Sequence, residues 1–313
     1  MKGSNLKIRL ENVNLSSNSG PNSFAQKLVR QFKKQGHSLV HQGYNTALCF
    51  IEDHSNLQGH NLVQRLDGIY FNTEFNYNLQ NQNILKTYKK SSGVIFQSEF
   101  SKKLVEAFFG EHDNSTVIHN GADIDLISLA KPTDNKILNS YNRVWSCAAS
   151  WRPHKRLKEN ISYFLEHKGD KDCLVVAGKP DYYFKDPNIY YVGELNYEKL
   201  LSLYKKSFYF LHLGWLDNCP NVVVDARAAG CHVVCTDAGG TVEVAGINST
   251  VIEDWWDFKP TELYKPPRLD FSKKIKNTYD TCYDMEETAK KYINFMSVNF
   301  KWIIKRIYLI YQI

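Results

Sequence analysis

The feature that most constrains the fold is a regular alternation of short β-branched runs with longer amphipathic stretches. In the first part of the chain the runs include LKIRLENVN, TALCFIED and GVIFQS. The stretch after the first run carries Phe24, Leu28 and Phe32 at helical spacing and ends at Gly36, which predicts a helix over 24–36. Strands that alternate with helices predict βα units and a parallel sheet.

The alternation occurs twice. A polar, proline-containing segment at 130–136 (AKPTDNK) interrupts it, and a second set begins near Arg143 with VWSCAAS, CLVVAGK and FYFLHLG. A length of 313 residues is also typical of about two domains. We therefore predict domains at 1–135 and 136–285, followed by a helical segment at 286–313.

Composition excludes several classes of protein. Hydrophobic residues are 43% and charged residues 23% of the chain, which is ordinary globular usage and argues against disorder. No apolar run is long enough to span a bilayer, and the first residues lack the apolar core of a signal peptide, so we expect a cytoplasmic protein. No nucleic-acid module is recognisable, and a net charge of +6 is compatible with an anionic small molecule or an acidic membrane surface as partner.

Cysteine spacing and the C-terminal run give two further expectations. The seven cysteines include no C-x-x-C pair, which predicts buried free thiols rather than a metal site. The final run, NFKWIIKRIYLIYQI, mixes basic and apolar residues. We favour packing on the first domain, and a weak peripheral association with the inner face of a membrane stays open.

The most informative stretch is 214–243. Asp217 and Asp225 are eight residues apart, the first in a loop after a predicted strand and the second about one turn into the next helix. That helix starts near Asn221, and the backbone N–H groups of Asn221 and Val222 would attract an anion through the positive end of the helix dipole. Asp225 can accept two hydrogen bonds from a ribose diol, and Asp217 would face the hydroxyls of the outer part of the ligand.

A glycine pair follows the next predicted strand. Gly239 and Gly240, with Thr241 directly after them, allow a tight turn and a close approach of the backbone to a ligand. Because ligands of parallel sheets bind at the carboxyl ends of the strands, the pattern predicts a nucleotide-like ligand without naming a reaction.

This stretch resembles the nucleotide-sugar-binding signature of retaining GT-B glycosyltransferases, which reads E-x7-E, A-x-A-x-G, P-V-V and G-G-x-x-E. The chain has D-x7-D, ARAAG, HVV and GGTVE, the last ending at Glu243. The likeness extends to SGVIFQSEFSKKLVEAFFG, to the turn at Asn120, Gly121 and Asp123, and to WSCAASWRPHKRL. Both glutamates of the signature are replaced by aspartates, each one methylene shorter.

The resemblance implies a GT-B fold, in which two Rossmann-like α/β domains face a central cleft and a C-terminal helix crosses back to the first domain. It implies transfer with retention from a UDP- or GDP-sugar substrate, without metal or other cofactor. The acceptor side is less readable, so a carbohydrate, a lipid-linked sugar and a protein all stay open.

The resemblance also implies roles for single residues. Arg152 and Lys155 would bind the donor diphosphate, and Arg156 could substitute for one of them. Asp67, with Arg65 beside it, would orient the sugar or the acceptor hydroxyl. The loop containing Gly20 and Asn22 would lie near the phosphates.

Two alternatives remain beside this interpretation. The first is a degenerate protein that binds the nucleotide sugar without transferring it. The second is a nucleotide-sugar epimerase of the same fold. His119 and His212 lie in apolar runs, and we interpret them as core or rim histidines rather than catalytic ones.

Overall fold

The computed structural model describes residues 5–17, 19–57 and 61–310, with side chains up to residue 298. It consists of two compact units. Unit 1 comprises Met1–Phe71, Phe75–Gly121 and Asp284–Ile313, and unit 2 comprises Asn72–Glu74 and Ala122–Tyr283. The boundary expected at 135/136 falls inside unit 2, and the C-terminal helix belongs to unit 1.

Unit 1 contains a six-stranded sheet in the order β2-β1-β3-β4-β5-β6, and all of its strand pairs are parallel. The strands are β1 (Lys7–Glu11), β2 (Ser38–Leu39), β3 (Thr46–Phe50), β4 (Asn61–Leu66), β5 (Gly93–Phe96) and β6 (Ser115–Val117). The β-branched runs of the first half thus form a parallel sheet, as predicted.

The helices of unit 1 are α1 (Gly20–Lys34), α2 (Tyr77–Lys90), α3 (Glu99–Phe109) and α10 (Met285–Ile310). Helix α1 begins four residues before the predicted start, because Pro21 at its first turn has a φ angle suited to a helix and needs no N–H partner there. Asn76 and Ser98 cap α2 and α3 through hydrogen bonds to backbone N–H groups.

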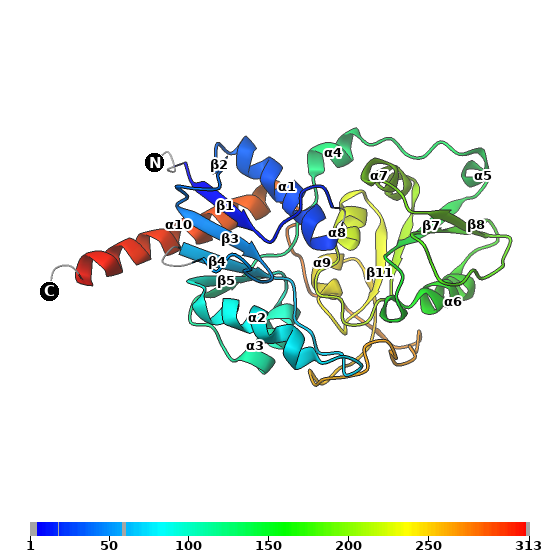
Figure 1. Cartoon of the computed structure of the whole chain (residues 1–313). Helices are drawn as coiled ribbons and strands as arrows, with labels where there is room; N and C mark the ends of the chain where they lie inside the picture. Colours follow the sequence, from blue (N-terminus) through cyan, green and yellow to red (C-terminus); the bar gives the residue numbers. More distant parts are fainter. Residues whose placement is uncertain (1–4, 18, 58–60, 311–313) are drawn as a thin grey trace. The chain divides into compact units, whose positions relative to one another are not determined.

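Helix α10 completes the core of unit 1. It contacts α1 and β4 (Figure 1), and its residues Met285, Tyr292 and Met296 are buried together with Phe24 and Ile8. The membrane hypothesis for the C-terminal run depends on side chains from 299 onward, which lie outside the described residues. Among the described residues no helix is long and apolar enough to cross a membrane.

Unit 2 contains a seven-stranded sheet in the order β13-β12-β11-β10-β7-β8-β9, parallel except for the β12–β13 pair. The strands are β7 (Arg143–Ala148), β8 (Asp172–Ala177), β9 (Ile189–Gly193), β10 (Tyr209–His212), β11 (His232–Thr236), β12 (Thr250–Ile252) and β13 (Lys274–Ile275). The helices are α4 (Ile124–Leu129), α5 (Lys136–Asn139), the 3₁₀ turn η1 (Pro153–Lys155), α6 (Leu157–His167), α7 (Tyr197–Lys206), α8 (Asn221–Ala228) and α9 (Thr241–Ala245).

The register of unit 2 aligns the carboxyl ends of its central strands. In this register His212, the last residue of β10, pairs with Cys235 of β11, and Phe210 pairs with Ser146 of β7. The loops that follow β7, β10 and β11 therefore emerge at one edge of the sheet. All seven cysteines are free as predicted, and only Cys282 is exposed.

Candidate functional site

A cluster of charged and polar side chains lies at this edge of unit 2. The Lys155 ammonium group, at the end of η1, pairs with the Asp217 carboxylate in the loop after β10. His212 Nε2 lies 2.9 Å from the same oxygen, Asp217 Oδ2. Because a carboxylate only accepts hydrogen bonds, His212 donates through Nε2–H. The structure thus brings Lys155 and Asp217 into direct contact.

The electrostatics of the cluster favour an ionised aspartate and a neutral histidine. Burial alone would raise the pKa of Asp217, but Lys155 and His212 hold it well below its ordinary value. Burial lowers the pKa of His212, against the opposing effect of Asp217. At neutral pH the cluster therefore contains one cation and one anion, with an uncharged imidazole hydrogen-bonded to the carboxylate.

Glycine at 239 lets the loop after β11 lie against the Asp217 backbone. Gly239 has φ +150°, and a Cβ there would lie 2.8 Å from the Asp217 carbonyl oxygen. The Gly240 N–H donates to that carbonyl at 2.8 Å, and the Gly239 N–H donates to Asp237 O at 2.9 Å. The backbone N–H groups of both glycines thus donate to protein carbonyls. The Gly240 hydrogen bond joins the loop after β11 to the loop after β10.

Two residues connect the η1 turn to the loop after β10. The backbone N–H of Trp215 donates to the backbone carbonyl of His154 at 2.7 Å. Asn160 of α6 donates to the carbonyls of Lys155 and Arg156 and accepts from the Leu213 N–H at 3.2 Å. These bonds hold the backbone that carries Lys155 next to the backbone that carries Asp217.

The two arginines near Lys155 have different environments. Arg152 is exposed, and no ion pair to it occurs among the described residues. Arg156 is 1% exposed, pairs with Asp254 at 2.7 Å and donates to Pro267 O at 2.7 Å. Arg156 therefore forms its ion pair in the interior of unit 2. Its buried position does not support the expectation that it could replace Arg152 or Lys155 at the donor diphosphate.

Helix α8 places the second aspartate in a buried position. Asp225 is 3% exposed and accepts a hydrogen bond from the Tyr197 hydroxyl of α7 at 3.3 Å. Burial raises the pKa of Tyr204 well above its ordinary value, and the charge of Asp225 adds to this effect. The helix begins at Asn221, followed by Val222, and its N-cap residue Pro220 provides no side-chain cap.

Helix α9 begins directly after the glycine pair. Its first residue, Thr241, is 1% exposed, and Thr241 Oγ1 has no hydrogen-bond partner among the described residues. Glu243 is also buried, and its carbonyl accepts from the Thr281 hydroxyl at 2.7 Å. A buried hydroxyl in this position is available to a ligand that enters the edge of the sheet.

Unit 1 contains a second cation–carboxylate cluster, centred on Arg65 of β4. Its guanidinium pairs with Asp67, two residues beyond it. Arg65 Nη2 also donates to Asn120 Oδ1 at 2.9 Å and to Gln97 Oε1 at 3.2 Å. Arg65 Nε donates to the Tyr292 hydroxyl of α10 at 3.0 Å. Four segments that are far apart in sequence thus supply the partners of one arginine.

Aromatic rings and an amide complete the surroundings of this cluster. The Arg65 guanidinium carbon lies 4.2 Å from the centroid of the Phe24 ring and 5.0 Å from that of Phe50. Gln97 Nε2 donates to Asp67 O at 2.7 Å, which holds the backbone of the aspartate. Arg65 is 1% exposed, whereas the Asp67 side chain is 15% exposed and is the polar member accessible to solvent.

The remaining predicted residues of unit 1 have separate roles. Gly20 begins α1, and a Cβ there would meet no atom within 4 Å. Asn22 accepts from the Asn14 N–H at 2.9 Å and donates to Ser19 Oγ at 2.9 Å, so it orders the loop before α1. A Cβ at Gly121 would lie 2.6 Å from Met285 Cα, so glycine there allows the start of α10 to approach.

Sequence reasoning missed part of the site in unit 2. His212 is buried, as expected for a core histidine, but it also contacts the predicted sugar-binding aspartate, which its apolar run did not indicate. Its position five residues before Asp217, at a strand end, is the signal that could have identified it. His119 stays outside this cluster, in unit 1. The described residues contain no group of three or more His, Cys, Asp or Glu side chains that could hold a metal ion.

Comparison with known proteins shows similarity in structure but not in sequence. No family model and no curated protein sequence matches the chain. Sucrose-phosphate synthase (tll1590) from Thermosynechococcus elongatus superposes with a TM-score of 0.62 and 10% identity, over 98% of both chains. AviGT4, a glycosyltransferase of avilamycin A biosynthesis, gives 0.60 and 14% identity, over 95% of this chain and 98% of that one.

A third structure was determined with ligands. Anabaena Alr3699/HepE, in complex with UDP and glucose, gives a TM-score of 0.59 and 13% identity, over 96% of this chain and 99% of that one. These neighbours are GT-B glycosyltransferases. At such low identity the likeness establishes the fold, so the prediction of a GT-B architecture with two Rossmann-like units is confirmed.

Proposed function

We propose that the protein is a glycosyltransferase that moves a sugar from a UDP- or GDP-sugar to an acceptor hydroxyl, with retention of configuration and without a metal ion. The observation that carries this proposal is the contact of Asp217 with both Lys155 and His212 at the carboxyl edge of the sheet in unit 2. At this edge of the sheet the cation can bind phosphate groups and the carboxylate can accept hydrogen bonds from hydroxyls, so the pair matches a ligand that carries both.

The diphosphate is assigned to the two cations after β7. Lys155 is positioned by the bonds of Asn160, and exposed Arg152 lies three residues before it. Both can form charge-assisted hydrogen bonds to a leaving diphosphate, and the dipole of α8, which begins at Asn221 and Val222, adds a fixed positive field. Stabilisation of the leaving group by cations and a helix terminus makes a metal unnecessary.

The hydroxyl-bearing parts of the donor are assigned to the two aspartates. Asp217 is ionised and can accept hydrogen bonds from the transferred sugar, while Asp225 accepts from the ribose diol once its contact with Tyr197 is shared or replaced. The backbone at Gly239 and Gly240 and the buried Thr241 hydroxyl form the opposite wall of the donor site.

The chemical step needs no side-chain nucleophile. The bond from the anomeric carbon to the phosphate oxygen breaks, the bond to the acceptor oxygen forms on the same face, and the leaving phosphate takes the acceptor proton. Asp67 is assigned to orientation of the sugar or the acceptor hydroxyl, because it is the partly exposed member of the Arg65 cluster.

The proposal is tested by incubating the protein with UDP- and GDP-sugars in EDTA, with a panel of sugar acceptors, and determining the anomeric configuration of any product by NMR. We expect a retained configuration and loss of product with Asp217→Asn. Asp257→Asn, at an exposed aspartate of the same unit, is the matched control.

Three results would contradict the proposal. Unchanged product formation by Asp217→Asn would remove the role of that residue. Nucleotide binding with no transfer to any acceptor would identify a non-enzymatic binding protein. Conversion of the donor in the absence of an acceptor would identify an epimerase.

A further inference from the structure

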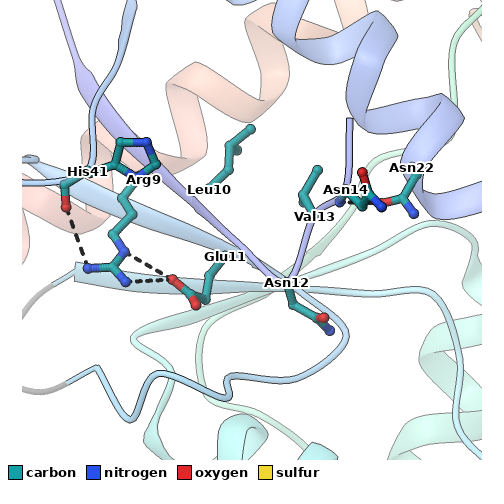
Figure 2. A pocket seen from close by; sticks show the side chains of 8 residues that line it. All are labelled: Arg9, Leu10, Glu11, Asn12, Val13, Asn14, Asn22 and His41. Carbon is teal, nitrogen blue, oxygen red and sulfur yellow. Dashed lines mark hydrogen bonds and ion pairs between the residues drawn. The ribbon is translucent and has the colours of Figure 1, made fainter. Parts of the chain in front are cut away.

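Unit 1 contains a pocket of about 460 Å³ that the proposed donor site does not use. It lies where β1 ends and α1 begins, and this volume is within the range of small-ligand sites. Figure 2 shows Arg9 and His41 at one end of the pocket, Asn14 and Asn22 at the other, and apolar side chains between them.

The charges that line this pocket cancel each other. Arg9 Nε and Nη2 lie 3.0 and 2.9 Å from Glu11 Oε2 (Figure 2), and Arg9 Nη1 donates to His41 O at 3.5 Å. The Ser55 hydroxyl donates to the other carboxylate oxygen of Glu11. Because the guanidinium is already paired, an anionic ligand would meet a neutral ion pair rather than an available positive charge.

Amide groups provide the remaining polar lining. Asn12 Nδ2 donates to Phe50 O at 2.8 Å, and Asn14 Oδ1 accepts from the Ser16 N–H at 3.0 Å. The other amide atoms, Asn12 Oδ1 and Asn14 Nδ2, have no hydrogen-bond partner among the described residues. One acceptor and one donor are thus available to the hydroxyl groups of a ligand.

Apolar side chains lie between these polar ends. Leu10 and Val13 line the middle of the pocket (Figure 2). A pyranose ring presents C–H groups on its faces and hydroxyls at its edges, so its faces would contact Leu10 and Val13 while its edges reach the amides and the Arg9–Glu11 pair.

We propose that this pocket binds an uncharged sugar ring, and therefore that the acceptor is a neutral carbohydrate. The assignment rests on the proposed function in naming the ligand an acceptor, but the binding claim stands on the pocket itself. It gives Asn22, which the sequence resemblance placed near the donor phosphates, the different role of fixing Asn14 at the pocket wall.

The test uses the full chain and measures binding of defined probes by NMR titration. The neutral probes are the methyl glycosides of glucose, galactose and mannose, and the anionic probes of matched ring are glucose 6-phosphate and methyl glucuronide. We expect at least one neutral probe to bind about tenfold more tightly than either anionic probe, with shifts in the backbone amides of residues 9–14. Tighter binding of an anionic probe, no binding of any neutral probe, or shifts elsewhere would overturn the proposal.

Two variants sharpen this test. Asn14→Ala removes the available amide donor and should weaken neutral-sugar binding about tenfold, whereas Asn78→Ala, at an exposed asparagine of α2, should leave it unchanged. Glu11→Gln leaves Arg9 without its carboxylate and should shift the preference toward the anionic probes. Equal binding by wild type and Asn14→Ala, or an unchanged preference in Glu11→Gln, would contradict the pocket assignment.

A parallel titration with UDP and GDP separates this inference from the proposed function. Sugar binding in the pocket without nucleotide binding would refute the donor site but leave the pocket. Nucleotide binding without sugar binding would refute the pocket alone.

Discussion

The two cation–carboxylate clusters of this protein are built in opposite ways. In unit 2, Lys155 and Asp217 lie on neighbouring loops at a sheet edge, and both side chains are partly exposed, at 19% and 15%. In unit 1, Arg65 is 1% exposed and is surrounded by partners from four segments, with only Asp67 partly open to solvent. The comparison suggests that the first cluster is arranged to bind a ligand and the second to hold one carboxylate in place.

The largest effect is expected from Arg65→Met. This change leaves the Asp67 carboxylate without its cation and removes one hydrogen-bond donor each from Gln97 and Asn120, so the free energy of unfolding should fall by about 3–5 kcal/mol. Urea denaturation of the full chain measures this change in the free energy of unfolding. Lys102→Met, which removes an exposed ion pair of α3, should cost about 0.5 kcal/mol at most. Equal costs for the two variants would contradict the structural role of Arg65.

In the cluster of unit 2, mutation should reduce transfer activity strongly and stability only slightly. Lys155→Met removes a cation assigned to the leaving diphosphate, so transfer should fall by about 10²–10³-fold, and the stability should change less than in Arg65→Met. Steady-state turnover and urea denaturation of the same preparations measure both quantities. Normal turnover with reduced stability would mean that Lys155 is structural, as Arg65 is.

The pH dependence of stability should come largely from unit 2. Burial and the charge of Lys155 lower the pKa of His154 to about 3, whereas an unfolded histidine titrates near 6.5. Between these values the unfolded state binds a proton that the folded state excludes, so stability is lost as the pH falls below 6.5. The loss should reach about 3 kcal/mol between pH 7 and pH 4.

The check is a series of thermal melts over that pH range. His154→Phe keeps an aromatic ring against Tyr264, 5.6 Å away between centroids, and should flatten the profile. A profile as steep as that of the wild type would contradict the assignment to His154.

The smallest effect concerns the tie between α10 and the Arg65 cluster. Tyr292→Phe removes one hydrogen bond to the guanidinium and should cost about 1–2 kcal/mol. The exposed Tyr70→Phe is the control and should have little effect. A cost no larger than that of the control would mean that the hydrogen bond between Arg65 and Tyr292 does not stabilise the packing of α10.

Features set by neighbouring residues could be predicted from the sequence better than contacts between residues that are far apart in it. The parallel strands, most helices and the free cysteines follow from local pattern. The phosphate role expected of Lys155 rested on the family resemblance, and its ion pair with Asp217 was not predicted. His212 was missed because a single histidine in an apolar run has no distinguishing signal. Asp67, Gln97 and Asn120 follow the ends of β4, β5 and β6, and Tyr292 lies in α10. No local pattern indicates that the last three of these residues will converge on Arg65.

We propose above all that unit 2 binds a nucleotide sugar through the Lys155–Asp217 cluster and α8. The most direct test is a thermal-shift screen of the full chain with UDP, GDP and their sugar conjugates in EDTA. We expect one nucleotide, at a hundredfold above its dissociation constant, to add about 2.7 kcal/mol of stability, and we expect Asp225→Ala and Lys155→Met to lose this gain. No stabilisation by any nucleotide, or equal stabilisation of both variants, would contradict it.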